Sequence, residues 1–168
     1  KICDGSGVTP LILGAGTNIL APDEGIDGLV ICLKDSLDGI ELVDETHIRV
    51  AAGVTMSRAA VFAANHNLGG LEFAHGIPGT VGGGVYMNAG AYGGEICQVF
   101  ESAVVMQPDG TSKTLSAEEM QFSYRHSVLE DTGDIVVSSV FRLEMKPTEE
   151  IKARMKELMD KRSKSQPL

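Results

Sequence analysis

A short apolar segment followed directly by small residues is the first candidate binding site in this sequence. Leu11-Ile12-Leu13 leads into Gly14-Ala15-Gly16-Thr17-Asn18. A turn of this composition can bring several backbone N–H groups together, and such a nest binds phosphate oxygens. The dinucleotide-binding fingerprint would need a third glycine where Ile19 stands, and the chain contains no Gly-Lys-Ser/Thr motif. The segment therefore predicts either an anion site or simply a tight loop after a strand.

A second glycine-rich segment lies 60 residues further along the chain. Ten of the 20 glycines fall between Gly69 and Gly94, in a stretch that contains no serine but includes large apolar side chains such as Phe73. Flexible linkers pair glycine with serine, so we expect packed structure in which glycine permits close approach to the backbone. Residues 76–84 are predicted to form a second glycine-rich loop.

Together the two loops indicate a ligand with a diphosphate and a long, flat, partly apolar body. No Lys or Arg occurs between Arg58 and Lys113, so backbone donors would have to hold a phosphate at the second loop. A dinucleotide cofactor has this chemistry. The alternative is a glycine-rich corner of a sheet without a ligand.

A third group of polar residues, Ser123-Tyr124-Arg125-His126-Ser127, could take part in chemistry. The guanidinium of Arg125 is permanently charged and suits a carboxylate or an enolate, and Tyr124 can donate a hydrogen bond. A hydrolase triad is not indicated, because the chain has no Gly-x-Ser-x-Gly motif. A surface arginine beside a half-buried tyrosine is the alternative interpretation.

The elements that must position these residues are mostly strands. Strand patterns cover residues 28–33, 39–43, 47–51, 102–106, 111–115 and 134–143. A helix is predicted from Met56 to Gly69 behind an N-cap at Thr55, with Met56, Ala59, Ala60, Ala63 and Ala64 on its apolar face. We further expect a short helix over residues 117–120 capped by Ser116, and a charged surface helix that starts near Thr148. Hairpins without regular βαβ alternation favour an α+β fold.

Composition narrows the class of protein. The 168 residues carry 14 Lys and Arg against 23 Asp and Glu, a net charge of −9, which weighs against broad nucleic-acid binding. No apolar run approaches the roughly 18 residues of a membrane span. Cys3, Cys32 and Cys97 are widely spaced and the four histidines are scattered, so we expect reduced thiols, no metal site and a cytoplasmic protein. No obligate protein partner is indicated.

The three motifs GAGTNIL (14–20), GIPGTVGGGVYMNAGAYG (76–93) and SYRHS (123–127) occur in the order found in one enzyme family. The chain resembles the UDP-N-acetylenolpyruvoylglucosamine reductases, the MurB flavoenzymes of peptidoglycan synthesis. The resemblance implies an FAD-binding fold of the vanillyl-alcohol-oxidase (PCMH) type. It also implies a division into residues 1–33, the end of a first FAD-binding subdomain, residues 34–147, a second subdomain, and residues 148–168, a helix and linker toward a substrate-binding domain outside this chain.

The resemblance also assigns candidate site residues. The FAD diphosphate would lie on the first loop, and the rest of the cofactor would lie against the second glycine-rich segment and a later strand. Arg125 matches the family's catalytic arginine and would polarise the carboxylate of the substrate, with Tyr124 beside flavin and substrate. The implied FAD-binding residues are Gly14, Ala15, Gly16, Thr17, Asn18, Pro78, Gly79, Gly82, Gly83, Asn88, Ala89, Gly90, Ala91, Ile135 and Val136.

The reaction implied by the resemblance is the NADPH-dependent reduction of UDP-N-acetylglucosamine enolpyruvate to UDP-N-acetylmuramate by way of FAD. The family's catalytic serine and glutamate belong to the substrate domain, and the motif of the serine is absent here. We therefore expect a fragment with negligible reductase activity and weak or absent FAD retention on its own. Two alternatives stay open: a flavin-linked oxidase on the same scaffold, in which His75 could carry a covalent flavin, and a non-enzymatic binding module.

Overall fold

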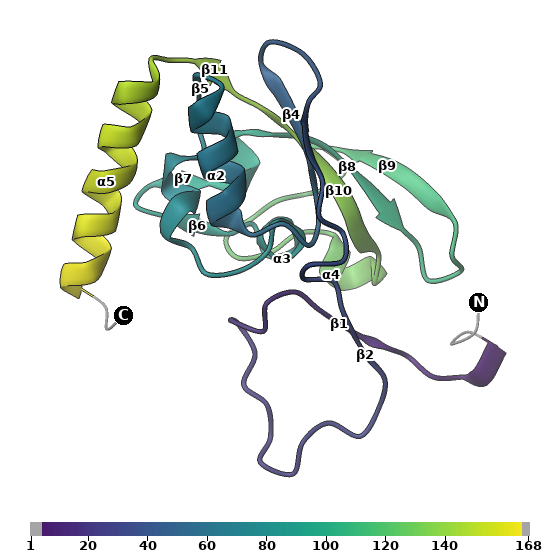
Figure 1. Ribbon diagram of the computed structural model, residues 1–168. Coiled ribbons are helices and arrows are strands. Elements are labelled where there is room, and N and C mark those ends of the chain that lie inside the picture. The colour runs from purple at the N-terminus through teal and green to yellow at the C-terminus, as the bar shows by residue number, and fades with distance from the viewer. Residues whose placement is uncertain (1–4, 166–168) are drawn as a thin grey trace.

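The centre of the molecule is a five-stranded antiparallel sheet. The computed structural model describes residues 5–165, and in it the strands follow the order β3-β4-β10-β8-β9 (Figure 1). Their bounds are Ile40–Leu42, His47–Ala51, Ile135–Arg142, Phe100–Met106 and Ser112–Ser116. β4 has the alternating burial that its sequence predicts, with Ile48 and Val50 fully buried. Mixed helix and sheet without parallel βαβ units confirms the α+β class.

The segment before the sheet forms a separate small unit. β1 (Leu11–Leu13) pairs in parallel with β2 (Val30–Cys32), and residues 14–29 connect the two strands as a long loop. In Figure 1 this unit extends below the sheet and helices. All three residues of β2 are exposed.

Helix α2 (Met56–Asn65) is the most accurately predicted helix. Thr55 is its N-cap, and the Thr55 hydroxyl oxygen accepts a hydrogen bond from the Arg58 N–H at 3.2 Å. Its buried residues are the five predicted ones. The helix ends at Asn65, before the expected Gly69, because the chain turns at Asn67 (φ 58°) into β5, Leu68–Gly69, which pairs with β11, Glu144–Met145.

The second glycine-rich segment is a loop only in part. Residues Val81–Tyr86 form helix α3, which packs on β4 and β10 and has Thr80 as its N-cap. A turn of 3₁₀-helix, η1 (Glu72–Gly76), precedes it, and a small hairpin of β6 (Gly90–Ala91) and β7 (Gly94–Glu95) follows. The prediction of a loop over all of residues 76–84 was therefore wrong from residue 81 onward.

A second correction concerns residues 117–120, which form a turn and not a short helix. The expected capping contacts are nevertheless present. The Ser116 N–H donates to a Glu119 carboxylate oxygen at 2.8 Å, and the Glu119 N–H donates to the Ser116 hydroxyl at 3.3 Å. The capping box thus closes a turn without continuing into a helix, and the chain leaves it through Gln121 at φ 48°.

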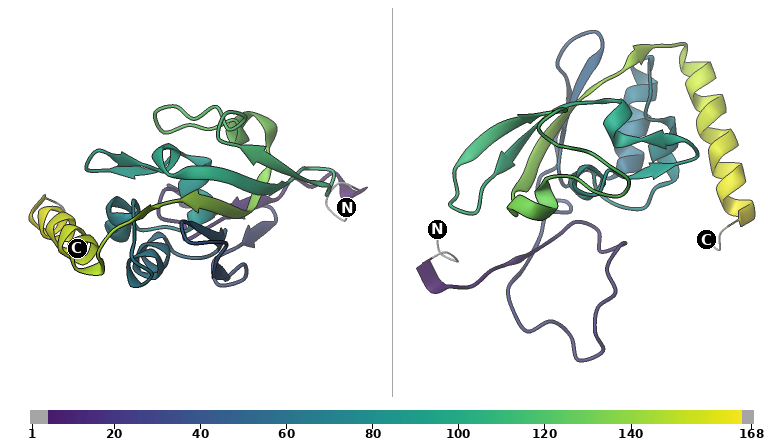
Figure 2. Two further views of the ribbon diagram at one scale, coloured as in Figure 1. Left: turned by 90° about the horizontal axis from the view of Figure 1, so that it is seen from above. Right: turned by 180° about the vertical axis from the view of Figure 1, so that it is seen from behind.

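The C-terminal helix α5 (Thr148–Ser165) begins where predicted and packs against η1 and α2. Seen from above, α2 and α5 lie on the same side of the sheet (Figure 2, left). Ile151, Met155 and Leu158 are its buried residues, whereas Met159 is only partly buried.

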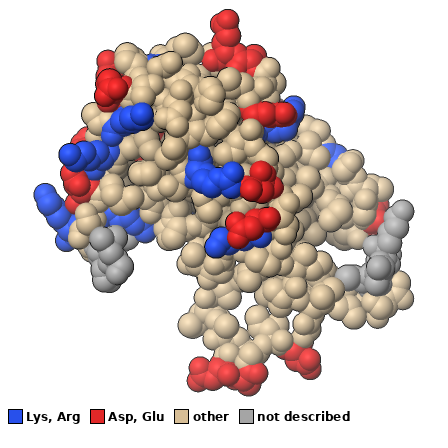
Figure 3. Space-filling model, viewed as in Figure 1, with Lys and Arg blue, Asp and Glu red and all other residues tan. Residues whose placement is uncertain are grey.

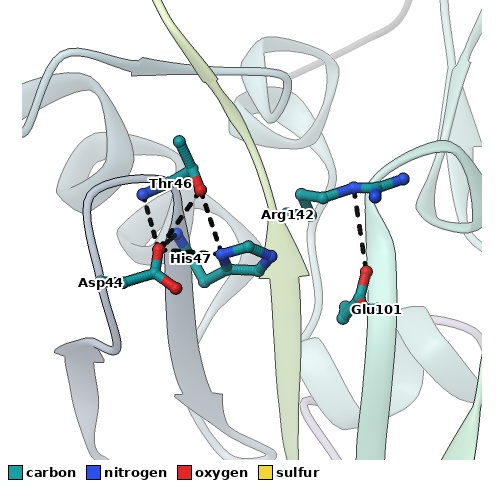
Figure 4. A network of polar contacts seen from close by, with 5 residues as sticks. All are labelled: Asp44, Thr46, His47, Glu101 and Arg142. Carbon is teal, nitrogen blue, oxygen red and sulfur yellow. Dashed lines mark hydrogen bonds and ion pairs between the residues drawn. The ribbon is translucent and has the colours of Figure 1, made fainter.

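A polar network stabilises the turn between β3 and β4. One carboxylate oxygen of Asp44 accepts hydrogen bonds from the backbone N–H of Thr46 at 2.8 Å and of His47 at 2.9 Å, and it lies 2.8 Å from the His47 ring (Figure 4). These interactions lower the pKa of Asp44 to about 2, with the Thr46 N–H as the largest cause. Nearby, the Arg142 Nε lies 3.8 Å from a Glu101 carboxylate oxygen.

Three further observations concern the charged surface, membrane-spanning helices and metal sites, and the free thiols. On the face drawn in Figure 3, Lys and Arg gather on the side of α5, while the tip of the N-terminal unit is acidic. Within residues 5–165, no helix is long and apolar enough to cross a membrane, and no cluster of His, Cys, Asp or Glu could hold a metal ion. Cys32 and Cys97 are free thiols, and Cys3 lies outside the described residues.

Candidate functional site

One large cavity brings the predicted segments together. It has a volume of about 1130 Å³ and lies between the N-terminal unit, the segment around α3, and the start of β10. This is slightly more than the usual volume of a pocket for a drug-sized ligand and leaves room for a large cofactor. Its lining includes Gly14, Ala15, Gly16, Thr17, Asn18, Pro78, Gly79, Gly82, Gly83, Ala89, Gly90, Ala91, Arg125, Ile135 and Val136.

The first loop, which lines this cavity, has free backbone donors. Within residues 5–165, none of the backbone N–H groups of residues 14–18 donates a hydrogen bond to another residue. Gly16 has a φ of 70°, a left-handed conformation that glycine adopts without strain. Backbone N–H groups without internal acceptors need a partner from outside the chain, which is the property that a phosphate-binding nest requires.

The two glycine-rich segments touch each other directly. The Thr17 hydroxyl donates to the Pro78 carbonyl oxygen at 2.8 Å, and the Asn18 amide lies 3.6 Å from the Met87 sulfur. A Cβ atom at Gly14 would come within 2.4 Å of the Thr80 hydroxyl oxygen. A side chain at position 14 would therefore displace the Thr80 hydroxyl, which shows how closely the loop after β1 approaches the start of α3.

Each of the three consecutive glycines of α3 has a different environment. A Cβ at Gly82 would lie 2.8 Å from the Ala52 Cβ, and one at Gly84 would lie 2.8 Å from the Met56 sulfur, so these two glycines let α3 pack closely. A Cβ at Gly83 would meet nothing closer than the Thr80 hydroxyl oxygen at 3.6 Å. Gly83 is exposed and lines the cavity, so nothing within the protein requires a glycine there.

Asn88 differs from its neighbours because its side chain does not line the large cavity. Its side chain is buried and forms hydrogen bonds to Glu95, Cys97 and Ser123. The other three members of the predicted run, Ala89, Gly90 and Ala91, do line the cavity.

Arg125 reaches the cavity from a tight turn. Ser123 and His126 pair across this turn, Arg125 has a φ of 56°, and its guanidinium donates to the Gly90 carbonyl oxygen at 3.2 Å. Tyr124, at the tip, is 84% exposed. Tyr124 and Arg125 also line a smaller adjoining cavity of about 190 Å³ next to the β6–β7 hairpin.

Three charged residues that the sequence did not indicate also line the large cavity: Glu130, Asp134 and Arg162. Asp134 is buried, and its carboxylate lies 2.8 Å from the Lys113 ammonium. Arg162 comes from the last turn of α5, with its side chain beside Gly76. In the sequence it is one of several basic residues of a surface helix, so no signal distinguished it.

Tyr86, at the end of α3, lines the cavity and has a phenol whose pKa is shifted. Burial raises the pKa of its phenol, and the nearby carboxylates of Glu130 and Asp131 raise it further. The phenol therefore stays protonated at neutral pH and can donate a hydrogen bond.

Comparison with known proteins agrees with this geometry. The family model described as FAD binding domain matches residues 1–116. The UDP-N-acetylenolpyruvoylglucosamine reductase of Agathobacter rectalis is 46% identical, covering 100% of this chain and 56% of the relative. That of Lactobacillus acidophilus is 48% identical, covering 85% of this chain and 47% of the relative. The chain thus spans about half the length of these relatives.

Solved structures show the same relationship. The crystal structure of UDP-N-acetylenolpyruvylglucosamine reductase (MurB) from Thermus caldophilus superposes with a TM-score of 0.80 at 34% identity, covering 99% of this chain and 60% of that one. The 6-hydroxy-D-nicotine oxidase from Arthrobacter nicotinovorans, at 16% identity and a TM-score of 0.63, shares the fold alone over 86% of this chain and 33% of that one. With the family model covering more than half of its residues, the chain belongs to the FAD binding domain family.

Proposed function

We propose that the large cavity binds FAD and that the chain is the cofactor-binding part of an NADPH-dependent reductase. Its reaction would be the reduction of UDP-N-acetylglucosamine enolpyruvate to UDP-N-acetylmuramate in the cytoplasm. The names and 46–48% identity of the curated relatives support this activity. The chemistry that FAD supplies when bound is hydride transfer from NADPH to the enolpyruvyl group.

The observation that carries the proposal is the row of free backbone N–H groups at residues 14–18, which line the same cavity as α3. We assign the FAD diphosphate to these groups, because such a nest suits phosphate oxygens. The bare backbone at Gly79 and Gly83 leaves room for a flat ring system, and Ile135 and Val136 add apolar surface. The cavity lies where residues 1–33 meet the rest of the chain, which supports the proposed subdomain division.

Arg125 is the residue that we assign to the substrate. It lines both cavities, and no carboxylate within the described residues forms an ion pair with it. A guanidinium can bind a carboxylate through two parallel hydrogen bonds. In the proposed reaction Arg125 holds the enolpyruvyl carboxylate and stabilises negative charge that develops beside it. Tyr124, which lines the smaller cavity together with Arg125, would contact the same ligand.

The proposal is tested on the complete gene product by visible absorbance. We expect flavin bands in the purified protein, bleaching by NADPH without oxygen, and recovery of the bands when UDP-N-acetylglucosamine enolpyruvate is added. A protein that neither retains nor takes up FAD would overturn the proposal. The isolated chain of residues 1–168 is expected to show no steady NADPH oxidation.

The alternative of a covalently flavinylated oxidase loses its candidate attachment residue. The His75 ring lies 3.2 Å from the Ser57 hydroxyl, in η1, and His75 is not among the residues that line the cavity. Acid denaturation separates the two functions, because a covalent flavin would stay with the polypeptide, whereas we expect the yellow colour to be released.

A further inference from the structure

The turn that carries Arg125 would be mobile without outside contacts. It is closed by two backbone hydrogen bonds, from the Ser123 N–H to the His126 carbonyl at 3.1 Å and from the His126 N–H to the Ser123 carbonyl at 3.3 Å. Tyr124 at its tip is almost fully exposed, and Arg125 has a left-handed backbone. A left-handed non-glycine residue persists only where its surroundings hold it. The contacts that hold this turn therefore decide where the guanidinium lies.

One of these contacts comes from the buried amide of Asn88. Its nitrogen donates to the Ser123 carbonyl at 3.0 Å and to a Glu95 carboxylate oxygen at 3.1 Å, and its oxygen accepts from the Cys97 N–H at 3.0 Å. Only 2% of Asn88 is exposed. The side chain thus ties the Arg125 turn to two other segments, its own turn after α3 and the start of η2, Ile96–Gln98.

The surroundings of Asn88 require an amide specifically. An acceptor must face the Cys97 N–H, while a donor must face both the Ser123 carbonyl and the Glu95 carboxylate. Aspartate has the same shape but only acceptors when ionised, so it would oppose two oxygens with a third. A buried group left without its partner costs more than the hydrogen bond itself contributes.

A second contact joins the Arg125 turn to the end of α3. The Ser127 hydroxyl, fully buried, donates to the Tyr86 carbonyl at the end of α3. The Arg125 guanidinium itself donates to the Gly90 carbonyl. Residues 86–90, which border the large cavity, therefore hold the Arg125 turn at three points.

We propose that Asn88 and Ser127 are positioning residues that clamp the Ser123–His126 turn to residues 86–90 and so aim Arg125 at the substrate carboxylate. The proposal rests on the proposed function, in which Arg125 binds that carboxylate. It gives Asn88 a role different from the direct cofactor contact expected from its sequence position. The clamp also links the segment that lines the cavity to the residue that binds the substrate.

The test measures ligand binding to the complete, FAD-loaded gene product without NADPH, so that turnover plays no part. The flavin spectrum reports binding of UDP-N-acetylglucosamine enolpyruvate and of UDP-N-acetylglucosamine, which lacks the carboxylate. The variants are N88D, S127A, R125A and the double variant N88D/R125A. C97A is the matched control, because it removes a neighbouring side chain and keeps the Cys97 N–H that Asn88 uses.

We expect N88D to raise the Kd for the enolpyruvyl ligand by about tenfold to a hundredfold, as for other misplaced binding groups. The Kd for UDP-N-acetylglucosamine should change by less than about twofold on the same physical grounds, since Arg125 has no carboxylate to meet there. S127A should act in the same direction with a smaller effect, and C97A should bind both ligands as the wild type does. In the R125A background, N88D should not raise the Kd for the enolpyruvyl ligand further, because both changes remove the same interaction.

Four outcomes would count against the inference. If R125A leaves the Kd for the enolpyruvyl ligand unchanged, Arg125 does not bind the carboxylate, and this part of the proposed function fails together with the clamp. If R125A weakens binding but N88D and S127A do not, the clamp alone is overturned. The clamp is also overturned if N88D raises the Kd of both ligands equally, or if the effects of N88D and R125A on the Kd are additive. If the N88D protein does not bind FAD, the S127A variant tests the clamp through the same comparison of the two ligands.

Discussion

Replacing Gly83 with alanine should move protein stability and cofactor affinity in opposite directions. Gly83 lies inside α3, has no left-handed backbone, and has space for a Cβ, whose nearest neighbour would be 3.6 Å away. Glycine inside a helix costs about 0.5–1 kcal/mol relative to alanine. We therefore expect Gly83→Ala to stabilise the FAD-free protein by about 0.5 kcal/mol, the lower end of that range because α3 has only 6 residues.

The same methyl group would occupy the side of α3 that lines the cavity. If the flat part of FAD lies against the bare backbone there, the added atom pushes it away. We expect FAD affinity to fall at least about tenfold, which corresponds to about 1.4 kcal/mol. A glycine needed for internal packing would instead lower stability on substitution, so the opposite signs identify a glycine that serves a ligand.

The two quantities are measured separately on the complete gene product. Urea unfolding of the FAD-free protein gives stability, and recovery of flavin fluorescence on dilution gives the FAD dissociation constant. Gly39→Ala is the matched control, because a Cβ there meets nothing within 4 Å and the residue lies outside the cavity. If Gly83→Ala binds FAD as tightly as the wild type, the cofactor does not approach α3 in the proposed way.

Three further predictions test packing, burial and charge. Gly82→Ala should lower the free energy of unfolding by about 1–3 kcal/mol, as overpacking does, since its Cβ would press on Ala52; the urea midpoint measures this. Ser139→Ala should leave that free energy unchanged or raise it by up to about 1 kcal/mol, because the buried Ser139 hydroxyl has no hydrogen-bond partner within the described residues; a lower urea midpoint would contradict this. The pKa of Asp44 is lowered from 3.8 to about 2, so the folded protein takes up this proton less readily than the unfolded chain, and the stabilisation is full above about pH 4 and lost as the pH falls toward 2. Asp44→Asn should therefore flatten the pH dependence of unfolding between pH 4 and 2 in urea titrations, and an unchanged slope would refute the assignment.

The sequence was most informative where one periodic pattern decided the structure. The alternation of residues 47–51 predicted β4 to the residue, and the small apolar face after Thr55 predicted the buried side of α2. In both cases local preference and burial favour the same structure. The end of α2 was missed because Asn67, not the later glycine, adopts the left-handed conformation that turns the chain.

Helix α3 shows why local propensity failed elsewhere. Three consecutive glycines weaken a helix in isolation, and the pattern Val-Gly-Gly-Gly-Val-Tyr indicated a loop. The helix forms because Val81 and Val85 are fully buried, and because Gly82 and Gly84 allow contact with Ala52 and Met56. Those partners lie about 30 residues earlier in the chain, so no local window contains the reason.

For the site, the sequence located both loops but not the charges around them. Arg162 and Asp134 reach the cavity from α5 and the start of β10, and only tertiary structure places them there. Asn88 was predicted to line the cofactor together with residues 89–91, and its side chain forms hydrogen bonds to Glu95, Cys97 and Ser123. A sequence motif identifies which residues belong together without showing which way each side chain points.

The charges in the cavity explain how a chain with net charge −9 could bind an anionic cofactor. Both acidic side chains that line the cavity have a nitrogen-bearing neighbour: the Asp134 carboxylate lies 2.8 Å from the Lys113 ammonium, and the Glu130 carboxylate lies 3.2 Å from the His126 ring. In contrast, neither Arg125 nor Arg162 has a carboxylate partner within residues 5–165. Because exposed charges more than about 8–10 Å apart are largely screened at physiological salt, an anion in the cavity responds mainly to the groups beside it, which include two unpaired guanidinium groups and free N–H groups. The net charge of the chain therefore argues against a polyanion spread over the surface, but not against a diphosphate enclosed in this cavity.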